Sequence, residues 1–209
     1  MVSHRAALST HRAVQTCAVK MPVHAVIHAI PLKDIGKPRM VIHQRRIVHI
    51  PMRGNRADWL EAHRRAAEKL LALLEEHPAM VYPVLGDPGV YASSSYLMRL
   101  VSQKHPCRVV PGITTMCAAA AELGVPLCEQ AERLTILDSF EPGEPLPEGN
   151  AVIMKSGRRL AALKEAAAGR EAYAVRNLGM DNAFIGRLED IPEDDYSYFT
   201  TVIIKGERT

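Results

Sequence analysis

The sequence predicts an α/β fold, because three separate segments each combine an apolar strand-like run, a tight turn and a helical pattern. The chain has 209 residues, of which 47% are hydrophobic. A chain of this length can bury one large core or two small ones. Its longest apolar stretches have the length of strands, so we expect no transmembrane helix and no membrane partner.

The first of these segments covers residues 80–101. Its apolar residues 80–85 predict a buried parallel strand. The Gly-Asp-Pro turn at 86–88 would then lie at the carboxyl edge of a sheet, where open α/β folds bind ligands. Gly86 allows close approach of the backbone, and the Asp87 carboxylate suits a hydroxyl, an ammonium or a sulfonium. The alternative is an ordinary surface turn.

The second segment covers residues 109–127. It predicts a strand at 109–110, a tight Pro-Gly turn and an alanine-rich helix that Gly124 ends. Thr114 or Thr115 can cap this helix and leave amide donors near its start for a polar ligand. The alternative is that the alanines serve only to pack the helix closely on a sheet.

The third segment begins with a short strand at 151–155. A turn at 156–158 leads into a helix that begins near Arg159. Alternating and β-branched residues then predict two more strands, at 172–175 and 198–205. The order strand, turn, helix and strand supports the α/β interpretation.

Upstream, a strand at 47–52 is followed by an amphipathic helix at 59–76. The apolar stripe of this helix has helical spacing. Its predicted members are Trp59, Leu60, Ala67, Leu70, Leu71 and Leu74.

The charge distribution by itself is compatible with several classes of partner. The net charge is +3, and basic residues precede the first acidic one, Asp34. Such a basic start suits nucleic-acid phosphates, a ligand rich in carboxylates or merely solvent. We expect no nucleic-acid partner, because aromatic residues are few and no binding module is recognised.

His24 and His28 lack further ligands at metal spacing, so no metal site is predicted. The four cysteines form no Cys-x-x-Cys pair, which favours reduced thiols in a cytoplasmic protein.

Two of these segments resemble the tetrapyrrole methylases. The string Gly-Asp-Pro-x-x-Tyr-x-Ser-x-Ser-Tyr-Leu at 86–97 is similar to the family's substrate-edge loop, above all in its precorrin-2 or cobalt-precorrin-2 C-20-methyltransferase branch. Residues 111–127 resemble the family's Pro-Gly turn, alanine-rich helix and Leu-Gly-Ile-Pro-Leu pattern. Residues 132–137 are similar to the family as well. The resemblance extends from about Ile27 to the end of the chain.

This resemblance implies two α/β domains, 1–112 and 113–209, with a cleft between them for S-adenosylmethionine. It also implies a homodimer. The family usually begins with a Gly-x-Gly-Pro-Gly-Asp loop, which this sequence lacks. Residues 1–26 are therefore atypical, and we interpret them as a divergent or truncated start. A targeting segment is the alternative.

The activity implied is methyl transfer from S-adenosylmethionine to C-20 of precorrin-2 or its cobalt complex, in cobalamin biosynthesis. Placement and exclusion of water are the enzyme's main tasks, so no catalytic residue is predicted. Tyr91 and Tyr96 are expected to face the tetrapyrrole substrate or to shape the entrance to its site, although Tyr91 can equally serve packing. Alternatives are methylation of another tetrapyrrole carbon, as in uroporphyrinogen III, and a catalytically impaired remnant or basic binding protein. The resemblance assigns the cofactor to Gly86, Asp87, Val90, Thr114, Thr115, Ser156, Leu178 and Thr201.

Overall fold

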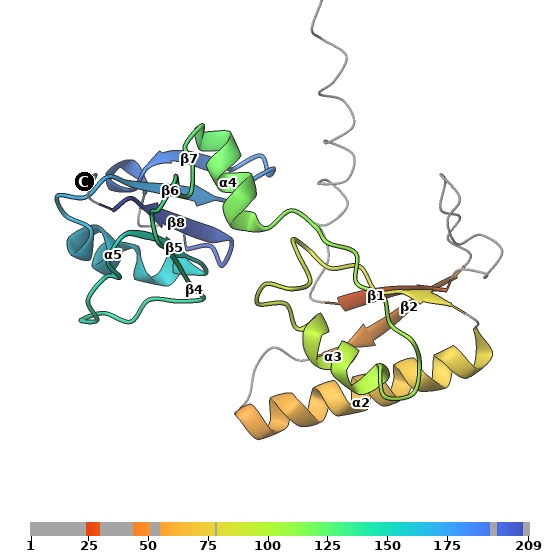
Figure 1. Cartoon of the computed structure of the whole chain (residues 1–209). Coiled ribbons are helices and arrows are strands. Elements are labelled where there is room, and N and C mark those ends of the chain that lie inside the picture. Colours follow the sequence, from red (N-terminus) through yellow and green to blue (C-terminus); the bar gives the residue numbers. More distant parts are fainter. Residues whose placement is uncertain (1–23, 30–43, 51–54, 78, 193–195, 207–209) are drawn as a thin grey trace, which may run out of the picture. The chain divides into compact units, whose positions relative to one another are not determined.

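The chain forms two compact units that meet in sequence between Gly112 and Ile113. The computed structural model describes residues 24–29, 44–50, 55–77, 79–192 and 196–206 (Figure 1). The first unit comprises the described residues up to Gly112, and the second comprises those from Ile113 onward. Each unit has its own cluster of buried apolar side chains.

The first unit contains a small antiparallel sheet in the order β2-β1-β3. Its strands are β1 (His24–Ala29), β2 (Gln44–His49) and β3 (Met80–Val81). β1 pairs with β2 along its full length and with β3 over two residues.

The predicted parallel strand at 80–85 is wrong in both length and direction. β3 ends at Val81 and runs antiparallel to β1. Pro83 has no amide hydrogen to donate to a neighbouring strand, which disfavours extension of the ladder along the apolar run. The predicted strand at 109–110 is absent too, and Val110 is 67% exposed. A β-branched residue favours a strand only where a neighbouring strand and a packed face are present.

Two helices accompany this sheet, α2 (Arg56–Glu76) and α3 (Ser94–Val101). Asn55 caps α2, because its side chain accepts a hydrogen bond from the Asp58 amide at 2.9 Å. The predicted stripe of α2 is largely confirmed, but Leu60 is 42% exposed. The core of the first unit is formed by Val48, Ile50, Ala66, Ala67, Leu70, Leu97 and Val101.

The second unit contains a five-stranded sheet in the order β4-β5-β8-β6-β7 (Figure 1). β4 and β5 are parallel, and the other neighbours are antiparallel. β8 is the last strand of the chain and lies in the middle of the sheet, between β5 and β6. The strands are β4 (Leu134–Leu137), β5 (Asn150–Ile153), β6 (Ala172–Arg176), β7 (Phe184–Arg187) and β8 (Thr200–Ile204).

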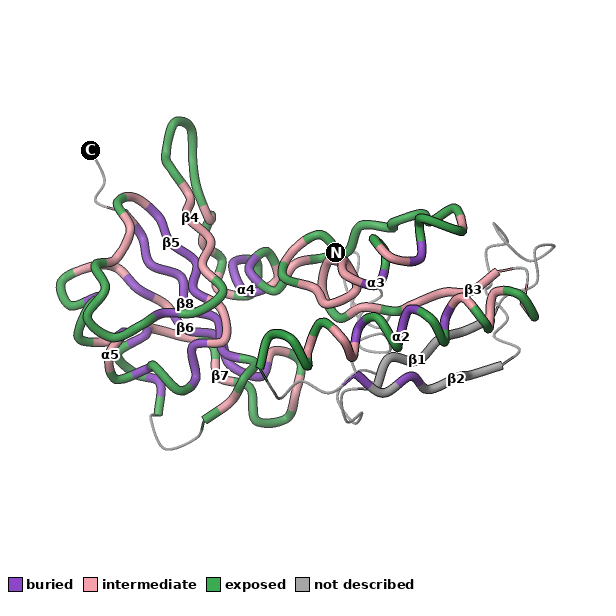
Figure 2. Tube along the Cα trace, turned by 90° about the horizontal axis from the view of Figure 1, so that it is seen from below, coloured by how far each residue is buried: buried purple, intermediate pink, exposed green. Residues whose placement is uncertain are grey.

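Helices accompany this sheet, and its central strands are buried (Figure 2). Leu160 and Leu163 of α5 join strand residues in one apolar cluster. α4 packs against β8 and β7. Thr114 caps α4 and Gly124 ends it in the left-handed conformation (φ 68°), as predicted. The helical elements are α4 (Thr115–Leu123), η2 (Ser156–Arg159), α5 (Leu160–Ala166) and η3 (Leu188–Asp190).

Several predictions concern parts of the chain outside the described residues, namely residues 1–23 with Cys17 and the side chains of His24 and His28. Cys107, Cys117 and Cys128 are free and exposed. Within the described ranges, no helix is both long and apolar enough to span a membrane. The same residues contain no cluster of three or more His, Cys, Asp or Glu suited to a metal ion.

Candidate functional site

In the first unit, the predicted cofactor residues lie in one tight turn. Gly86 has φ 83°, a conformation that favours glycine. The amide of Val90 donates to the Asp87 carbonyl at 3.3 Å, which closes the turn. The amide of Gly89 donates to Asp87 Oδ1 at 2.7 Å. The carboxylate of Asp87 therefore shapes the loop that carries it.

The other oxygen of Asp87 reaches a segment 25 residues further along the chain. Asp87 Oδ2 accepts a hydrogen bond from the Gly112 amide at 2.8 Å. A Cβ on Gly112 would lie 2.1 Å from the Gly86 carbonyl oxygen, so only glycine fits here. The sequence marked Gly112 as part of a turn and did not reveal this contact.

The two predicted substrate residues differ in their surroundings. Tyr91 is 52% exposed and has φ 48°, which is unusual for an aromatic residue. Tyr96 is half-buried and packs edge-on against Trp59, with ring centroids 4.5 Å apart. The Arg99 guanidinium lies 4.6 Å from the centre of the Tyr96 ring.

A third tyrosine of the same unit, Tyr82, has its pKa raised by burial. Its phenol therefore stays protonated at neutral pH and cannot act as a base.

In the second unit, strand register brings three predicted residues to one edge of the sheet. Thr201 of β8 pairs with Val175 of β6, next to the end of that strand. Leu178 lies just beyond the same end, and Ser156 follows the end of neighbouring β5. Because β8 is antiparallel to both strands, its beginning lies at this edge.

Two predicted threonines are in contact at this edge. Thr115 Oγ1, at the start of α4, lies 3.4 Å from Thr201 Oγ1. The neighbouring Thr114 uses its hydroxyl to accept a hydrogen bond from the Cys117 amide at 3.2 Å. Thr115 is exposed, whereas Thr201 is only 4% exposed. The hydroxyl pair therefore joins the beginning of α4 to the central strand.

Ser156 and Leu178 contribute in different ways. Ser156 is fully buried, and its hydroxyl donates to the Ile153 carbonyl at 2.9 Å. That hydroxyl holds the turn after β5. Leu178 is half-buried, so part of its apolar side chain is accessible.

The same edge contains residues that the sequence did not single out. A Cβ on Gly157 would lie 2.1 Å from the Ser197 carbonyl oxygen and 2.9 Å from the Ser197 amide nitrogen. The Ser197 hydroxyl donates to Asn177 Oδ1 at 2.5 Å. The Asn177 amide donates to the Phe199 carbonyl at 2.9 Å. Residues 197–199 are thus fixed against the turns that follow β5 and β6. A glycine beside a predicted ligand residue was the only sequence signal for this contact.

Backbone strain is concentrated beside the predicted site residues. Among the described residues, four that are not glycine have positive φ: Tyr91, Gln130, Lys155 and Asn177. Tyr91 is itself a predicted substrate residue, and Lys155 and Asn177 directly precede Ser156 and Leu178. Strained conformations of this kind often occur at ligand sites, where the surrounding structure maintains them.

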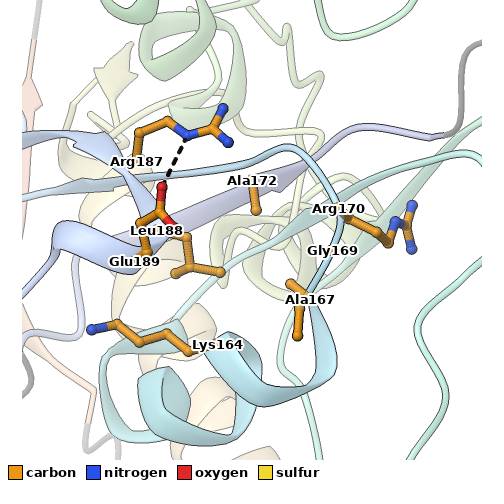
Figure 3. Close-up of a pocket in the computed structure, with 9 residues that line it drawn as sticks. Lys164, Ala167, Gly169, Arg170, Ala172, Arg187, Leu188 and Glu189 are labelled. Carbon is orange, nitrogen blue, oxygen red and sulfur yellow. Dashed lines mark ion pairs between the residues drawn. The ribbon is translucent and has the colours of Figure 1, made fainter.

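A small pocket lies elsewhere in the second unit (Figure 3). Its volume is about 160 Å³, and it includes Ala172 at the start of β6, opposite the edge described above. Its cations have protein partners, as Lys164 donates to the Ile191 carbonyl and Arg187 forms an ion pair with Glu189. We therefore do not assign a ligand to this pocket, because drug-sized ligands need about 300 Å³ or more.

Comparison with known sequences identifies close relatives. The chain is 33% identical over 150 residues to a precorrin-2 C(20)-methyltransferase from Sinorhizobium sp, covering 68% of this chain and 58% of the relative. It is 27% identical over 141 residues to a protein named probable cobalt-precorrin-2 C(20)-methyltransferase from Methanocaldococcus jannaschii, covering 64% and 61%. The chain thus spans about three fifths of the length of these relatives.

Solved structures share the fold. One is a putative cobalamin synthesis related protein from Corynebacterium diphtheriae, with a TM-score of 0.55, 20% identity and coverage of 68% of this chain and 69% of that one. Another is a uroporphyrin-III-C-methyltransferase from Thermus thermophilus, with a TM-score of 0.52, 22% identity and coverage of 68% and 70%. The family model of the tetrapyrrole (corrin/porphyrin) methylases matches residues 17–192. The chain belongs to the tetrapyrrole methylase family.

Proposed function

We propose that this protein transfers a methyl group from S-adenosylmethionine to C-20 of precorrin-2 or cobalt-precorrin-2, a step of cobalamin biosynthesis. Membership of the family supports methyl transfer, and the two relatives described above support C-20 as the position. The structural observation that carries the proposal is the contact between Thr115 and Thr201 at the sheet edge that Leu178 also borders.

The residues at this edge fit an adenosyl cofactor. Ribose and adenine present hydroxyl, amine and ring-nitrogen groups, which suit threonine hydroxyls and backbone amides. Thr115 and Thr201 would supply the hydroxyls, and the accessible part of Leu178 would supply an apolar contact for adenine. In the first unit, the backbone of Gly86 and Val90 would contribute a further contact.

S-adenosylmethionine supplies a methyl group that its sulfonium already activates. The remaining tasks of the protein are to hold the two reactants in line and to exclude water. Rigid turns serve the first task, which agrees with the bonds that fix the segments around Asp87 and Ser197. No general base is assigned, and the pKa of Tyr82 is raised, away from that role.

The exposed Tyr91 is our candidate for contact with the tetrapyrrole. Tyr96 packs on Trp59, so we propose that it shapes the substrate site through α3.

We further propose a cytoplasmic homodimer, with no membrane or nucleic-acid partner. The sequence supports a reducing compartment, because its four cysteines form no Cys-x-x-Cys pair.

An enzymatic assay tests this function. The protein is incubated with precorrin-2 and S-adenosylmethionine carrying a ¹³C-labelled methyl group, and the product is analysed by mass spectrometry and NMR. We expect a single added methyl group with its signal at C-20. Parallel incubations use cobalt-precorrin-2 and uroporphyrinogen III. Methylation at another carbon, or of uroporphyrinogen III alone, would overturn the C-20 proposal.

Cofactor binding is tested separately by calorimetry with S-adenosylhomocysteine. Thr201→Val removes one hydroxyl and keeps the side chain's shape, and we expect binding to weaken about tenfold. Thr135→Val on β4 is the matched control, since it makes the same chemical change in another strand of the sheet. Equal affinities for the two variants would remove Thr201 from the site. Absence of binding by the unaltered protein would contradict the proposed activity.

A further inference from the structure

We infer that Asp87 is a positioning residue, whose carboxylate ties the Gly86–Gly89 turn to Gly112 and thereby sets the backbone of the cofactor site. This inference rests on the proposed function. It differs from the sequence-based expectation, which assigned the carboxylate itself to the cofactor. We call the arrangement of Gly86, Asp87, Gly89 and Gly112 the Asp87 clasp.

Both oxygens of the carboxylate take part in the clasp. Oδ1 accepts the Gly89 amide at 2.7 Å, and Oδ2 accepts the Gly112 amide at 2.8 Å. These are short hydrogen bonds to a charged acceptor, which belong to the stronger class. One side chain therefore bridges two backbone segments that are 25 residues apart in sequence.

Close backbone packing supports the same contact. The position of a Cβ on Gly112 would be 2.1 Å from the Gly86 carbonyl oxygen and 3.1 Å from its carbonyl carbon. The Gly112 backbone thus lies directly against the Gly86 peptide. Glycine is required at position 112 because any side chain would separate the two segments.

The clasp fixes the end of the first unit. Gly112 is its last residue, and the chain continues through Ile113 to Thr114, the cap of α4. Asp87, which accepts the Gly112 amide, is half-buried, whereas Ile113, the residue after Gly112, is 65% exposed. The described residues 106–113 belong to no helix or strand. The carboxylate therefore supplies an order that secondary structure does not provide.

Hydrogen exchange tests the clasp without any ligand. In the unaltered protein, we expect slow exchange of the Gly89 and Gly112 amides, because both donate to the carboxylate. In Asp87→Ala, exchange at both amides should rise about tenfold or more. The amides of α2 (Arg56–Glu76) report whether the first unit remains folded. Unchanged exchange at Gly112 would overturn the inference.

Asp87→Asn provides a second variant in case the alanine variant loses the protection of α2. An asparagine keeps one acceptor oxygen and places an NH₂ group where the second oxygen was. One of the two glycine amides should then lose its protection, while α2 keeps it. Asp58→Asn is the matched control, since it makes the same change at an exposed residue of the same unit. Protection of both glycine amides in Asp87→Asn would refute the clasp.

A double-mutant cycle separates positioning from direct contact. Affinity for S-adenosylhomocysteine is measured for Asp87→Ala, Gly112→Ala and the double variant. If both residues act through the clasp, each single substitution weakens binding about tenfold. The double variant then binds S-adenosylhomocysteine as tightly as the single variant with the lower affinity. Losses that multiply in the double variant would show that the carboxylate contacts the cofactor independently, which would overturn the positioning role.

The two measurements also distinguish this inference from the proposed function. If the unaltered protein binds no S-adenosylhomocysteine, the proposed function fails, and hydrogen exchange still decides whether the clasp exists. If the protein binds the ligand and exchange at Gly112 is independent of Asp87, the proposed function stands and the clasp fails.

Discussion

The two units place their predicted site residues by different means. In the second unit, Thr201 lies in a central strand whose following residues, Val202, Ile203 and Ile204, are fully buried. Pairing with β5 and β6 fixes its position. In the first unit, the site turn follows a two-residue strand and depends on the carboxylate of Asp87. A core thus positions one group of residues, and a single side chain positions the other.

This difference predicts how far the effect of a substitution extends through each unit. A substitution in a buried sheet lowers the stability of the whole unit, because packing in a core is continuous. A defect in a turn held by two hydrogen bonds alters local order and leaves the helices nearby in place. Substitutions in the two units should therefore differ more in their effect on stability than in their effect on ligand affinity.

The largest loss of stability is expected from Leu163→Ala. Leu163 of α5 is fully buried in the core of the second unit. Truncation leaves a cavity and should lower the free energy of unfolding by about 2–5 kcal/mol. Urea denaturation monitored by circular dichroism measures this change in the free energy of unfolding. Leu60→Ala, at a residue that is 42% exposed, is the control and should change stability by less than about 1 kcal/mol. Equal effects of the two substitutions would contradict the core assignment.

Gly157→Ala should affect both stability and ligand binding. The new Cβ would collide with the Ser197 backbone, which is part of another segment and has no side-chain freedom to yield. Overpacking of this kind costs about 1–3 kcal/mol of stability. Because Gly157 adjoins Ser156 at the predicted cofactor edge, affinity for S-adenosylhomocysteine should fall as well.

The matched control for this variant is Gly186→Ala in β7. Its Cβ would lie 3.2 Å from the end of the Phe184 side chain and not against backbone, so a shift of a few tenths of an ångström by that ring relieves the contact. We expect Gly186→Ala to keep the affinity of the unaltered protein. If Gly157→Ala binds equally well, the contact between Gly157 and Ser197 does not shape the site.

The sequence predicted those elements whose signals are local. The capping threonine, the alanines and the terminal glycine of α4 lie within eleven consecutive residues, and the helix begins and ends where they indicate. α2 also follows from its own periodicity. Family motifs located the turns at Gly86 and Thr114 for the same reason.

Features that depend on distant residues could not be predicted in this way. The length of β3 depends on a partner strand and on Pro83, and periodicity alone does not include either. The position of β8 between β5 and β6 joins strands about 25 to 50 residues apart in the sequence. The bond from Asp87 to Gly112 likewise joins two motifs that the sequence shows only separately.

Thr114→Ala is expected to have an intermediate effect. It removes the oxygen that accepts the Cys117 amide, and loss of such a cap costs about 1 kcal/mol. Thermal denaturation should show this loss, and Thr114→Ser should restore most of it, because serine also caps helices. If the alanine and serine variants are equally stable, the hydroxyl does not stabilise α4, and its packing on the sheet together with the contact to Thr201 positions its first residue, Thr115.

The smallest effect is expected on the surface of α2, where Glu61 accepts hydrogen bonds from Arg64 and Arg65. These bonds lower the pKa of Glu61 to about 2. An unfolded glutamate has a pKa of about 4.3, so the folded state holds this proton less tightly. The resulting stabilisation is complete at pH values above about 4.3 and is lost as the pH falls toward 2.

Glu61→Gln should therefore show a weaker loss of stability than the unaltered protein between about pH 4.3 and pH 2. The difference should be small and should shrink in about 1 M salt, because the charges are exposed and screened. Thermal denaturation across this pH range measures it, with Glu75→Gln on the same helix as the control. If the difference persists undiminished in high salt, the stabilisation by Glu61 is not that of an exposed ion pair. The first unit would then depend on charge in its helix as well as in its turn, and its contrast with the core-built second unit would become sharper.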